Sequence, residues 1–90
     1  MSHFDRNSGS MEKANQILGA FLRDRRVQSG LSLDSVSKLL GQPKESITLW
    51  EDEPLRVPLN QFSKMISVYK FTQAEFQEMI CEVECVFRKH

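Results

Sequence analysis

Two cysteines lie one helical turn apart near the end of the chain, a spacing at which thiols can bind a metal or report on redox state. Cys81 and Cys85 are the only cysteines in the sequence. Side chains four residues apart on a helix have Cβ atoms about 5 to 6 Å apart, whereas a disulfide requires about 3.5 to 4.5 Å. A zinc site needs further ligands, and only acidic residues such as Glu78 and Glu82, together with His90, are near. We therefore expect reduced thiols without metal or cofactor, and keep metal binding or redox sensing as the minor alternative.

The sequence contains no arrangement of residues that is typical of a catalytic site. It lacks a glycine-rich phosphate loop, a nucleophile elbow and a histidine pair of the metalloprotease type. Its two histidines, His3 and His90, lie near the ends of the chain and have no partner residues that would indicate catalysis. We expect that the protein is not an enzyme.

The charges of the chain balance when it is taken whole. Twelve basic residues match twelve acidic ones, and the isoelectric point is near 6.7. Residues 1–70 hold ten basic and eight acidic residues, a net charge of +2, so residues 71–90 carry −2. Many nucleic-acid binders are strongly basic, so composition alone argues mildly against a polyanionic partner.

The length of 90 residues suits one domain, and 40% hydrophobic and 27% charged residues are typical of globular proteins. No apolar run approaches the roughly 18 residues that a membrane span needs. The first ten residues lack the apolar stretch of a signal peptide. We therefore expect a cytoplasmic protein that does not contact the membrane.

Capping residues and helical spacing divide the first half of the chain into an arm and two helices. The polar segment 1–10 is expected to be a flexible arm. Apolar residues at three- and four-residue steps predict a helix over 11–28, which Gly30 ends. Ser32 is a natural N-cap for a short second helix, and Gly41 ends that helix.

The second half of the chain predicts three more helices. Pro43 suits the first position of a third helix that runs to about residue 51, and residues 52–57 lack a helical pattern. Pro58 can open a fourth helix. Thr72 and Glu75 form a capping box for a fifth helix, which continues to the end of the chain. Because no segment alternates with the period of a strand, the fold class is all-α.

The second and third helices, joined by Leu40-Gly41-Gln42, have the layout of a helix-turn-helix. Over about residues 15–75 the chain resembles the phage-repressor and Cro (XRE) type of helix-turn-helix domain. The resemblance implies a compact five-helix, lambda-repressor-like bundle with a helix-turn-helix core at residues 11–71. It also implies a transcription regulator, with repression as the expected mode, that binds operator DNA as a dimer. The matching residues are Leu22, Arg23, Arg26, Gly30, Leu31, Ser32, Leu40, Gly41, Ser46, Ile47, Trp50, Glu51 and Pro58.

The resemblance assigns a structural role to Arg26 and Glu51. In domains of this type, an ion pair at these positions ties the first helix to the end of the third. A partly buried pair of this kind is a scaffold feature, because removing one partner leaves an unpaired charge. The residues expected in the core around it are Leu22, Leu31, Val36, Leu40, Ile47 and Trp50.

The resemblance also assigns the outer side of the third helix to DNA. Lys44 can donate to guanine O6 and N7, Glu45 can accept from cytosine N4, and Leu49 can cover a thymine methyl. Phosphates are expected near Ser32, Ser46 and the loop that contains Arg56. The full set of candidate DNA contacts is Ser32, Gln42, Lys44, Glu45, Ser46, Thr48, Leu49 and Arg56.

Several residues on this surface depart from the family pattern. Leu33 stands where the family commonly has a glutamine that anchors a phosphate, and Glu53 stands where a glycine is usual. Asp52 and Glu53 add negative charge beside the expected phosphate path. Exposed leucines close together can mark a protein contact. The rival interpretation is therefore a protein-interaction module that uses Leu33 and Leu49 and has lost DNA binding.

The last helix, expected over 72–90, is longer than a bundle of this size readily covers. Val83, Val86 and Phe87 on its far end then need a partner, and the same helix of a second subunit would supply one. This segment is therefore the predicted dimerisation element of a homodimer. The alternative is a helix that frays beyond about Cys85.

Overall fold

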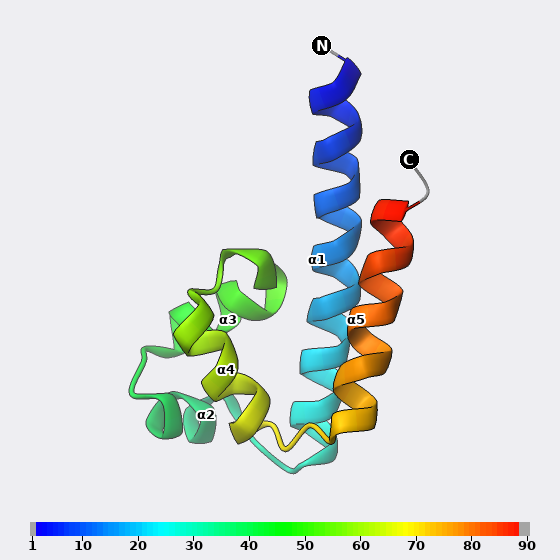
Figure 1. Ribbon diagram of the computed structural model, residues 1–90. Coiled ribbons are helices and arrows are strands. Elements are labelled where there is room, and N and C mark those ends of the chain that lie inside the picture. Colours follow the sequence, from blue (N-terminus) through cyan, green and yellow to red (C-terminus); the bar gives the residue numbers. More distant parts are fainter. Residues whose placement is uncertain (1, 89–90) are drawn as a thin grey trace.

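Five α-helices and one short 3-10 helix lie within residues 2–88, and Figure 1 shows how they are arranged. The computed structural model describes residues 2–88, with side chains from residue 9 onward. No strand occurs within these residues, so the expected all-α class with five helices is confirmed. The elements in order are α1 (Ser2–Gln28), α2 (Leu33–Leu40), α3 (Lys44–Asp52), η1 (Pro54–Arg56), α4 (Leu59–Val68) and α5 (Gln73–Arg88).

The predicted capping residues define the helix ends. The hydroxyl of Ser32 accepts a hydrogen bond from the Ser35 backbone at 3.1 Å and caps α2. The sequence predicted that Pro43 and Pro58 occupy the first helical position. Each is instead the N-cap residue, so α3 and α4 begin one residue later than predicted. The expected loop 52–57 begins one residue later, because α3 includes Asp52, and the short helix η1 lies within it. These ends are set locally, because each cap depends on residues within one turn.

The predicted capping box of α5 is present. The Thr72 backbone N–H donates to Glu75 Oε1 at 2.9 Å, and the Glu75 N–H donates to Thr72 Oγ1 at 3.1 Å. The hydrogen bond that the Thr72 backbone N–H donates to the Glu75 carboxyl group lowers the pKa of that group below its usual value, and the Thr72 side chain lowers it further. The box therefore fixes the residue at which α5 begins.

The start of α1 differs from the sequence prediction. The helix begins at Ser2, so residues 2–10 are helical rather than an arm that precedes the helix. Ser10, which was expected to end the arm, is only 4% exposed. Once a packed turn has nucleated a helix, each further residue adds a hydrogen bond without a new nucleation cost. The segment contains no proline, and the single Gly9 is not enough to end it.

The predicted core residues gather where α1, α2, α3 and α4 meet. Leu22, Val36, Leu40 and Ile47 are buried there together with Met65 of α4 and Tyr69, the C-cap residue of α4. Leu31 and Trp50 are partly buried and pack against this cluster. The core prediction is therefore confirmed, with two of its members at the edge.

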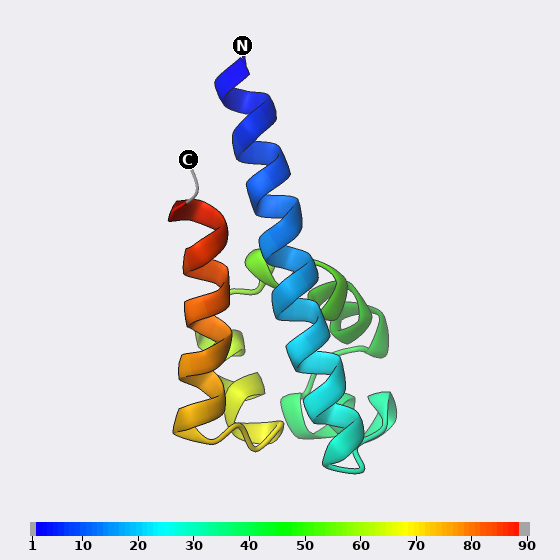
Figure 2. The same cartoon turned by 90° about the vertical axis from the view of Figure 1, so that its right-hand side faces the viewer.

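Helix α5 packs chiefly against α1, and the two helices run antiparallel, as Figures 1 and 2 show. Arg25 Nη1 lies 3.3 Å from Glu75 Oε2 at one end of the pair, and Met79 is fully buried. The expected overhang of α5 is wrong, because the longer helix is α1, whose N-terminal end projects past α5 (Figure 2). At about 1.5 Å per residue, the 27 residues of α1 account for the longest dimension of the molecule, 42 Å.

Candidate nucleic-acid interface

A tight turn joins α2 to α3 and sets the direction in which α3 leaves. Gly41 has a φ of 66°, a left-handed conformation that glycine adopts without strain, and its N–H bonds to the Ser37 carbonyl. The Gln42 N–H donates to the same carbonyl at 3.1 Å, and the Ser37 hydroxyl donates to the Gln42 carbonyl. Gln42, a candidate DNA contact, is half-buried and held in this turn by its backbone.

The side of α3 that was expected to face DNA is exposed. Lys44, Glu45, Thr48 and Leu49 all lie on the exposed side of the helix. Ile47 is fully buried on the opposite side, and Trp50 is half-buried beside it. Ser46 is half-buried, at the edge between the two sides. Four of the candidate contacts on α3 thus form one accessible strip, defined here as the α3 strip (Lys44, Glu45, Thr48 and Leu49).

The two cations among the candidate DNA contacts, Lys44 and Arg56, are paired with acidic side chains. Lys44 Nζ lies 3.1 Å from Asp34 Oδ1, which links the first turns of α2 and α3. Arg56 Nε lies 3.0 Å from Glu53 Oε1, directly after α3. Both pairs are exposed to solvent, so neither contributes much to stability. Their main effect is that the surface around the α3 strip has little net positive charge.

Ser32 serves the fold in a way that limits its availability to a ligand. Its hydroxyl accepts the Ser35 N–H and lies 3.1 Å from the Ser35 hydroxyl. The residue is exposed at the start of α2, so its position is compatible with the expected phosphate contact. Its side-chain oxygen is nevertheless engaged in capping.

The two leucines of the rival interpretation differ in exposure. Leu49 is 43% exposed on α3. The expectation that Leu33 is exposed is wrong, because it is half-buried and packs against the core cluster. As the first residue of α2, it faces inward with Val36 and Leu40. The exposed leucine of α2 is instead Leu39.

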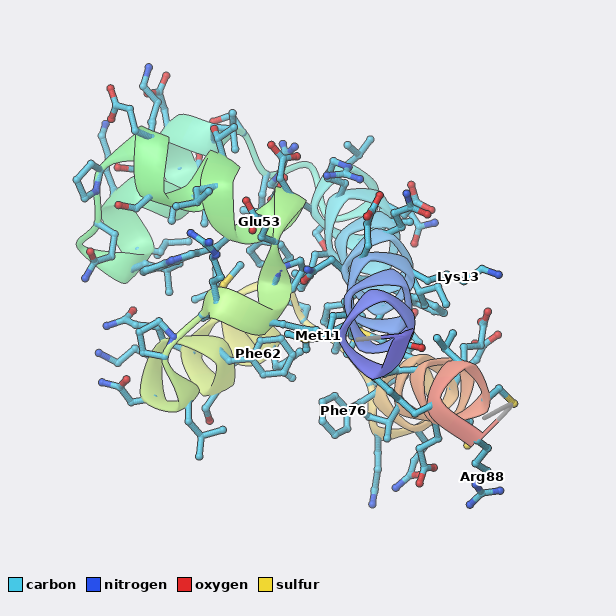
Figure 3. All side chains as sticks on the ribbon, turned by 90° about the horizontal axis from the view of Figure 1, so that it is seen from above. Met11, Lys13, Glu53, Phe62, Phe76 and Arg88 are labelled. Carbon is cyan, nitrogen blue, oxygen red and sulfur yellow. The ribbon has the colours of Figure 1, made fainter. Side chains whose placement is uncertain are left out.

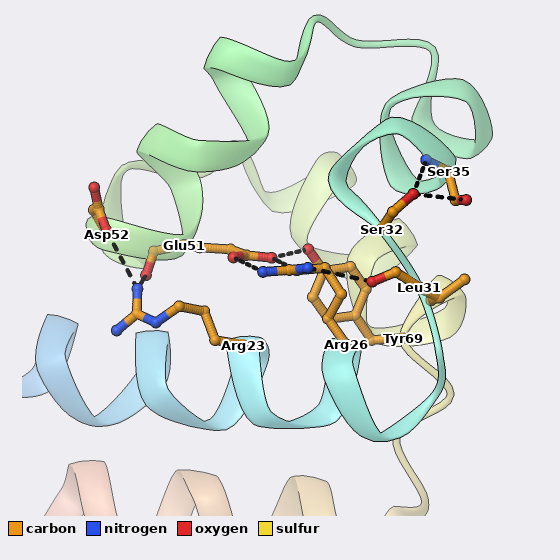
Figure 4. A network of polar contacts seen from close by, with 8 residues as sticks. All are labelled: Arg23, Arg26, Leu31, Ser32, Ser35, Glu51, Asp52 and Tyr69. Atoms are coloured by element: carbon orange, nitrogen blue, oxygen red, sulfur yellow. Dashed lines mark hydrogen bonds and ion pairs between the residues drawn. The ribbon is translucent and has the colours of Figure 1, made fainter.

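The predicted ion pair between Arg26 and Glu51 is present, and it holds the end of α3 against α1 (Figure 4). Arg26 Nε donates to Glu51 Oε2 at 2.7 Å, and Nη2 donates to Oε1 at 3.3 Å. The remaining guanidinium nitrogen donates to the Leu31 carbonyl at 3.2 Å. The Glu51 side chain is 4% exposed, so this is a buried pair with several hydrogen bonds.

A tyrosine completes this buried network. The Tyr69 hydroxyl donates to Glu51 Oε2 at 2.6 Å (Figure 4). No pattern in the sequence signals this hydrogen bond. Glu51 thus receives donors from both α1 and the end of α4, which fixes α3 relative to two other elements.

Burial raises the pKa of the Tyr69 hydroxyl well above its usual value, and the hydrogen bond to Glu51 raises it further. A raised pKa in the folded state contributes stability below about pH 10, where an unfolded tyrosine is also protonated. Above that pH only the unfolded chain releases this proton. We therefore expect the free energy of unfolding to fall by up to about 1.4 kcal/mol per pH unit above pH 10.

Tyr69 is the only tyrosine, so its ionisation can be followed by phenolate absorbance. The expected result is that phenolate appears only as the protein unfolds, and that Tyr69→Phe removes this part of the pH dependence. A phenolate transition near pH 10 in a protein that is still folded would contradict the prediction.

Two residues of α1, Arg23 and Gly19, contact the end of α3 in ways that the sequence did not predict. Arg23 Nη1 donates to the Glu51 carbonyl at 3.0 Å and pairs with Asp52 at 3.2 Å (Figure 4). At Gly19, a Cβ would lie far inside van der Waals contact with the same carbonyl oxygen. Only glycine therefore allows α1 and α3 to approach this closely.

The other predicted site residues lie on α5. Val83 and Val86 are half-buried, and Phe87 is 45% exposed. Cys81 and Cys85 are exposed free thiols. Among the described side chains, no three His, Cys, Asp or Glu residues come together as potential metal ligands. His90 lies outside the described residues, and the side chain of His3 lies outside the described side chains.

Of the helices within residues 2–88, none combines the length and the apolar character that a membrane span requires. No protein-family model matches the chain, and neither a curated protein nor a solved structure matches it. The candidate interface is therefore known only from its own residues and their geometry.

Proposed function

We propose that the protein is a sequence-specific DNA-binding transcription regulator, in which α2 and α3 act as a helix-turn-helix and α3 enters the major groove. The observation that carries this proposal is the exposed α3 strip, which projects a cation, a carboxylate, a hydroxyl and an apolar side chain from one helix. These groups can contact guanine, cytosine and the thymine methyl in the major groove. The buried pair of Glu51 with Arg26 supports the proposal, because it holds the end of α3 against α1 while the opposite side of α3 is exposed.

A salt titration with duplex DNA tests this function. We expect Lys44→Ala to weaken binding to a selected sequence by roughly 5- to 150-fold if Lys44 contacts a base edge. Lys13→Ala is the matched control, because Lys13 carries the same charge but points away from α3 and α4 on α1 (Figure 3). Its expected effect is small.

Sequences for this titration come from selection out of a random duplex pool. Duplex binding that is absent in the wild-type protein, or that does not respond to salt, would contradict the proposal. Equal losses in the two variants would show that Lys44 acts only through net charge.

We also propose that the regulator is a homodimer formed through the end of α5. This part of the proposal is supported by Phe87, which is 45% exposed beside half-buried Val83 and Val86. Two copies related by a two-fold axis would present two α3 helices to half-sites about one helical turn of DNA apart.

Sedimentation of two single variants tests the dimer. We expect Phe87→Ser to shift the protein from dimer to monomer, because it removes an apolar side chain from the proposed contact. Cys85→Ser is the control, since Cys85 is exposed on the opposite side of the same turn of α5. A wild-type protein that is monomeric at all concentrations would contradict this part of the proposal.

The second candidate function is a protein-interaction module on the same scaffold. Two observations favour it: Leu49 is exposed at the centre of the surface, and the neighbouring cations Lys44 and Arg56 are paired with carboxylates. Leu33 no longer supports it, because that side chain packs against the core. This candidate predicts that duplex binding is absent at low salt, which separates it from the first.

A further inference from the structure

We infer that Asp34 and Glu53 restrain sequence-independent binding to DNA, because they pair with Lys44 and Arg56, the two cations among the candidate DNA contacts, which could otherwise bind any phosphate. The inference rests on the proposed DNA-binding function and adds a specific role for two acidic residues. Neither residue is a candidate DNA contact, and each touches one that is.

The geometry of the two pairs supports this role. Asp34 Oδ1 lies 3.1 Å from Lys44 Nζ, and Glu53 Oε1 lies 3.0 Å from Arg56 Nε. The four side chains are between 42% and 71% exposed. Exposed pairs contribute little to stability, so they can open without loss of the fold. Both carboxylates flank the α3 strip, one from the first turn of α2 and the other from the residue that follows α3.

The consequence for binding follows from the electrostatics of DNA. Sequence-independent affinity comes almost entirely from cations that neutralise phosphates and release counterions. A cation that already has a carboxylate partner releases fewer counterions when it reaches a phosphate. To bind, Lys44 and Arg56 must leave their partners, and the freed carboxylates of Asp34 and Glu53 then lie close to the phosphates and repel them. This surface therefore contributes little to the affinity for a duplex of arbitrary sequence.

The same arrangement leaves base-edge contacts intact. Lys44 can exchange the Asp34 carboxylate for guanine O6 and N7, which replaces one strong acceptor by another. That exchange is available only where a guanine lies opposite Lys44. The two carboxylates thus make the interface depend on its base contacts more than on its charge.

The test measures affinity for a random duplex over a range of salt concentrations. The variant is the full chain with Asp34→Asn and Glu53→Gln, which keeps the size of both side chains but removes their negative charge. We expect its affinity for random duplex to rise about 2- to 5-fold per substitution, the scale of an exposed ion pair. We also expect the slope of log K against log salt to steepen by about one for each freed cation.

The control is Glu78→Gln together with Glu82→Gln, which changes the net charge equally at two exposed positions of α5. Thermal unfolding of each variant confirms that the fold is kept. A rise in affinity that is larger in the Asp34 and Glu53 variant than in the control supports the inference.

Two results would overturn the inference, and they are distinguishable. Equal affinities in the variant and the control, with clear salt-dependent binding by the wild-type protein, overturn the inference and leave the proposed function standing. An absence of duplex binding in the wild-type protein and in both variants overturns the proposed function as well. Binding of random duplex that appears only in the Asp34 and Glu53 variant, while the wild-type protein binds only the selected sequence, supports the restraint directly.

Discussion

Replacement of Glu51 by alanine is expected to lower the free energy of unfolding by about 3 to 5 kcal/mol, the cost of removing one partner from a buried ion pair. The Arg26 guanidinium, which is 15% exposed, would lose its only carboxylate, and the Tyr69 hydroxyl would lose its acceptor. A small domain is stabilised by about 5 to 15 kcal/mol in total. The variant is therefore expected to be partly unfolded under mild conditions.

Urea unfolding measures this effect, with the fluorescence of Trp50, the single tryptophan, as the signal. Asp52→Ala is the matched control on the next residue, because its ion pair with Arg23 is exposed and worth about 1 kcal/mol or less. A loss in Glu51→Ala no larger than in the control would mean that the buried network does not stabilise the fold.

Replacement of Gly19 by alanine is expected to destabilise the protein by about 2 kcal/mol, although alanine is the better helix former. In an open helix position, this change would stabilise the helix by about 1 kcal/mol. At Gly19, however, the added Cβ would overlap the backbone carbonyl oxygen of Glu51. Because a backbone atom cannot rotate away, α3 would have to shift from α1, and overpacking of this kind costs about 1 to 3 kcal/mol.

Gly9→Ala is the control for this prediction, since nothing lies within 4 Å of a Cβ at Gly9 on the same helix. It is expected to raise the free energy of unfolding by up to about 1 kcal/mol. Urea unfolding of both variants shows whether the change in the free energy of unfolding has opposite signs in the two. If both substitutions stabilise the protein, α1 and α3 do not approach as closely as the structure shows.

The helix ends and the core could be predicted from the sequence for a common reason. The caps at Ser32, Gly41 and Thr72 involve residues within one turn, so their types and spacing are enough. Spacing at three and four residues likewise predicted that Ile47 is buried and that the α3 strip is exposed. Pattern rules failed at the start of α1, because a polar segment without a proline can extend a helix that is already formed.

The partners of charged and polar groups could not be predicted in this way. The resemblance indicated the pair of Arg26 and Glu51, but no local pattern joins Tyr69 to Glu51 or Lys44 to Asp34. Each of these contacts joins side chains of different elements, so it depends on how whole elements pack. For the same reason, the overhanging helix proved to be α1 rather than α5.

By itself, the sequence determined that the chain is all-helical, where most of its helices begin and end, and which side of residues 44–52 faces outward. These properties follow from interactions within one or two helical turns. Only the tertiary structure decided that Gly19 lies against the Glu51 carbonyl and that the cations beside the α3 strip are already paired. Such properties depend on the distance between helices, which is set by the packing of the whole core and is not contained in any single segment.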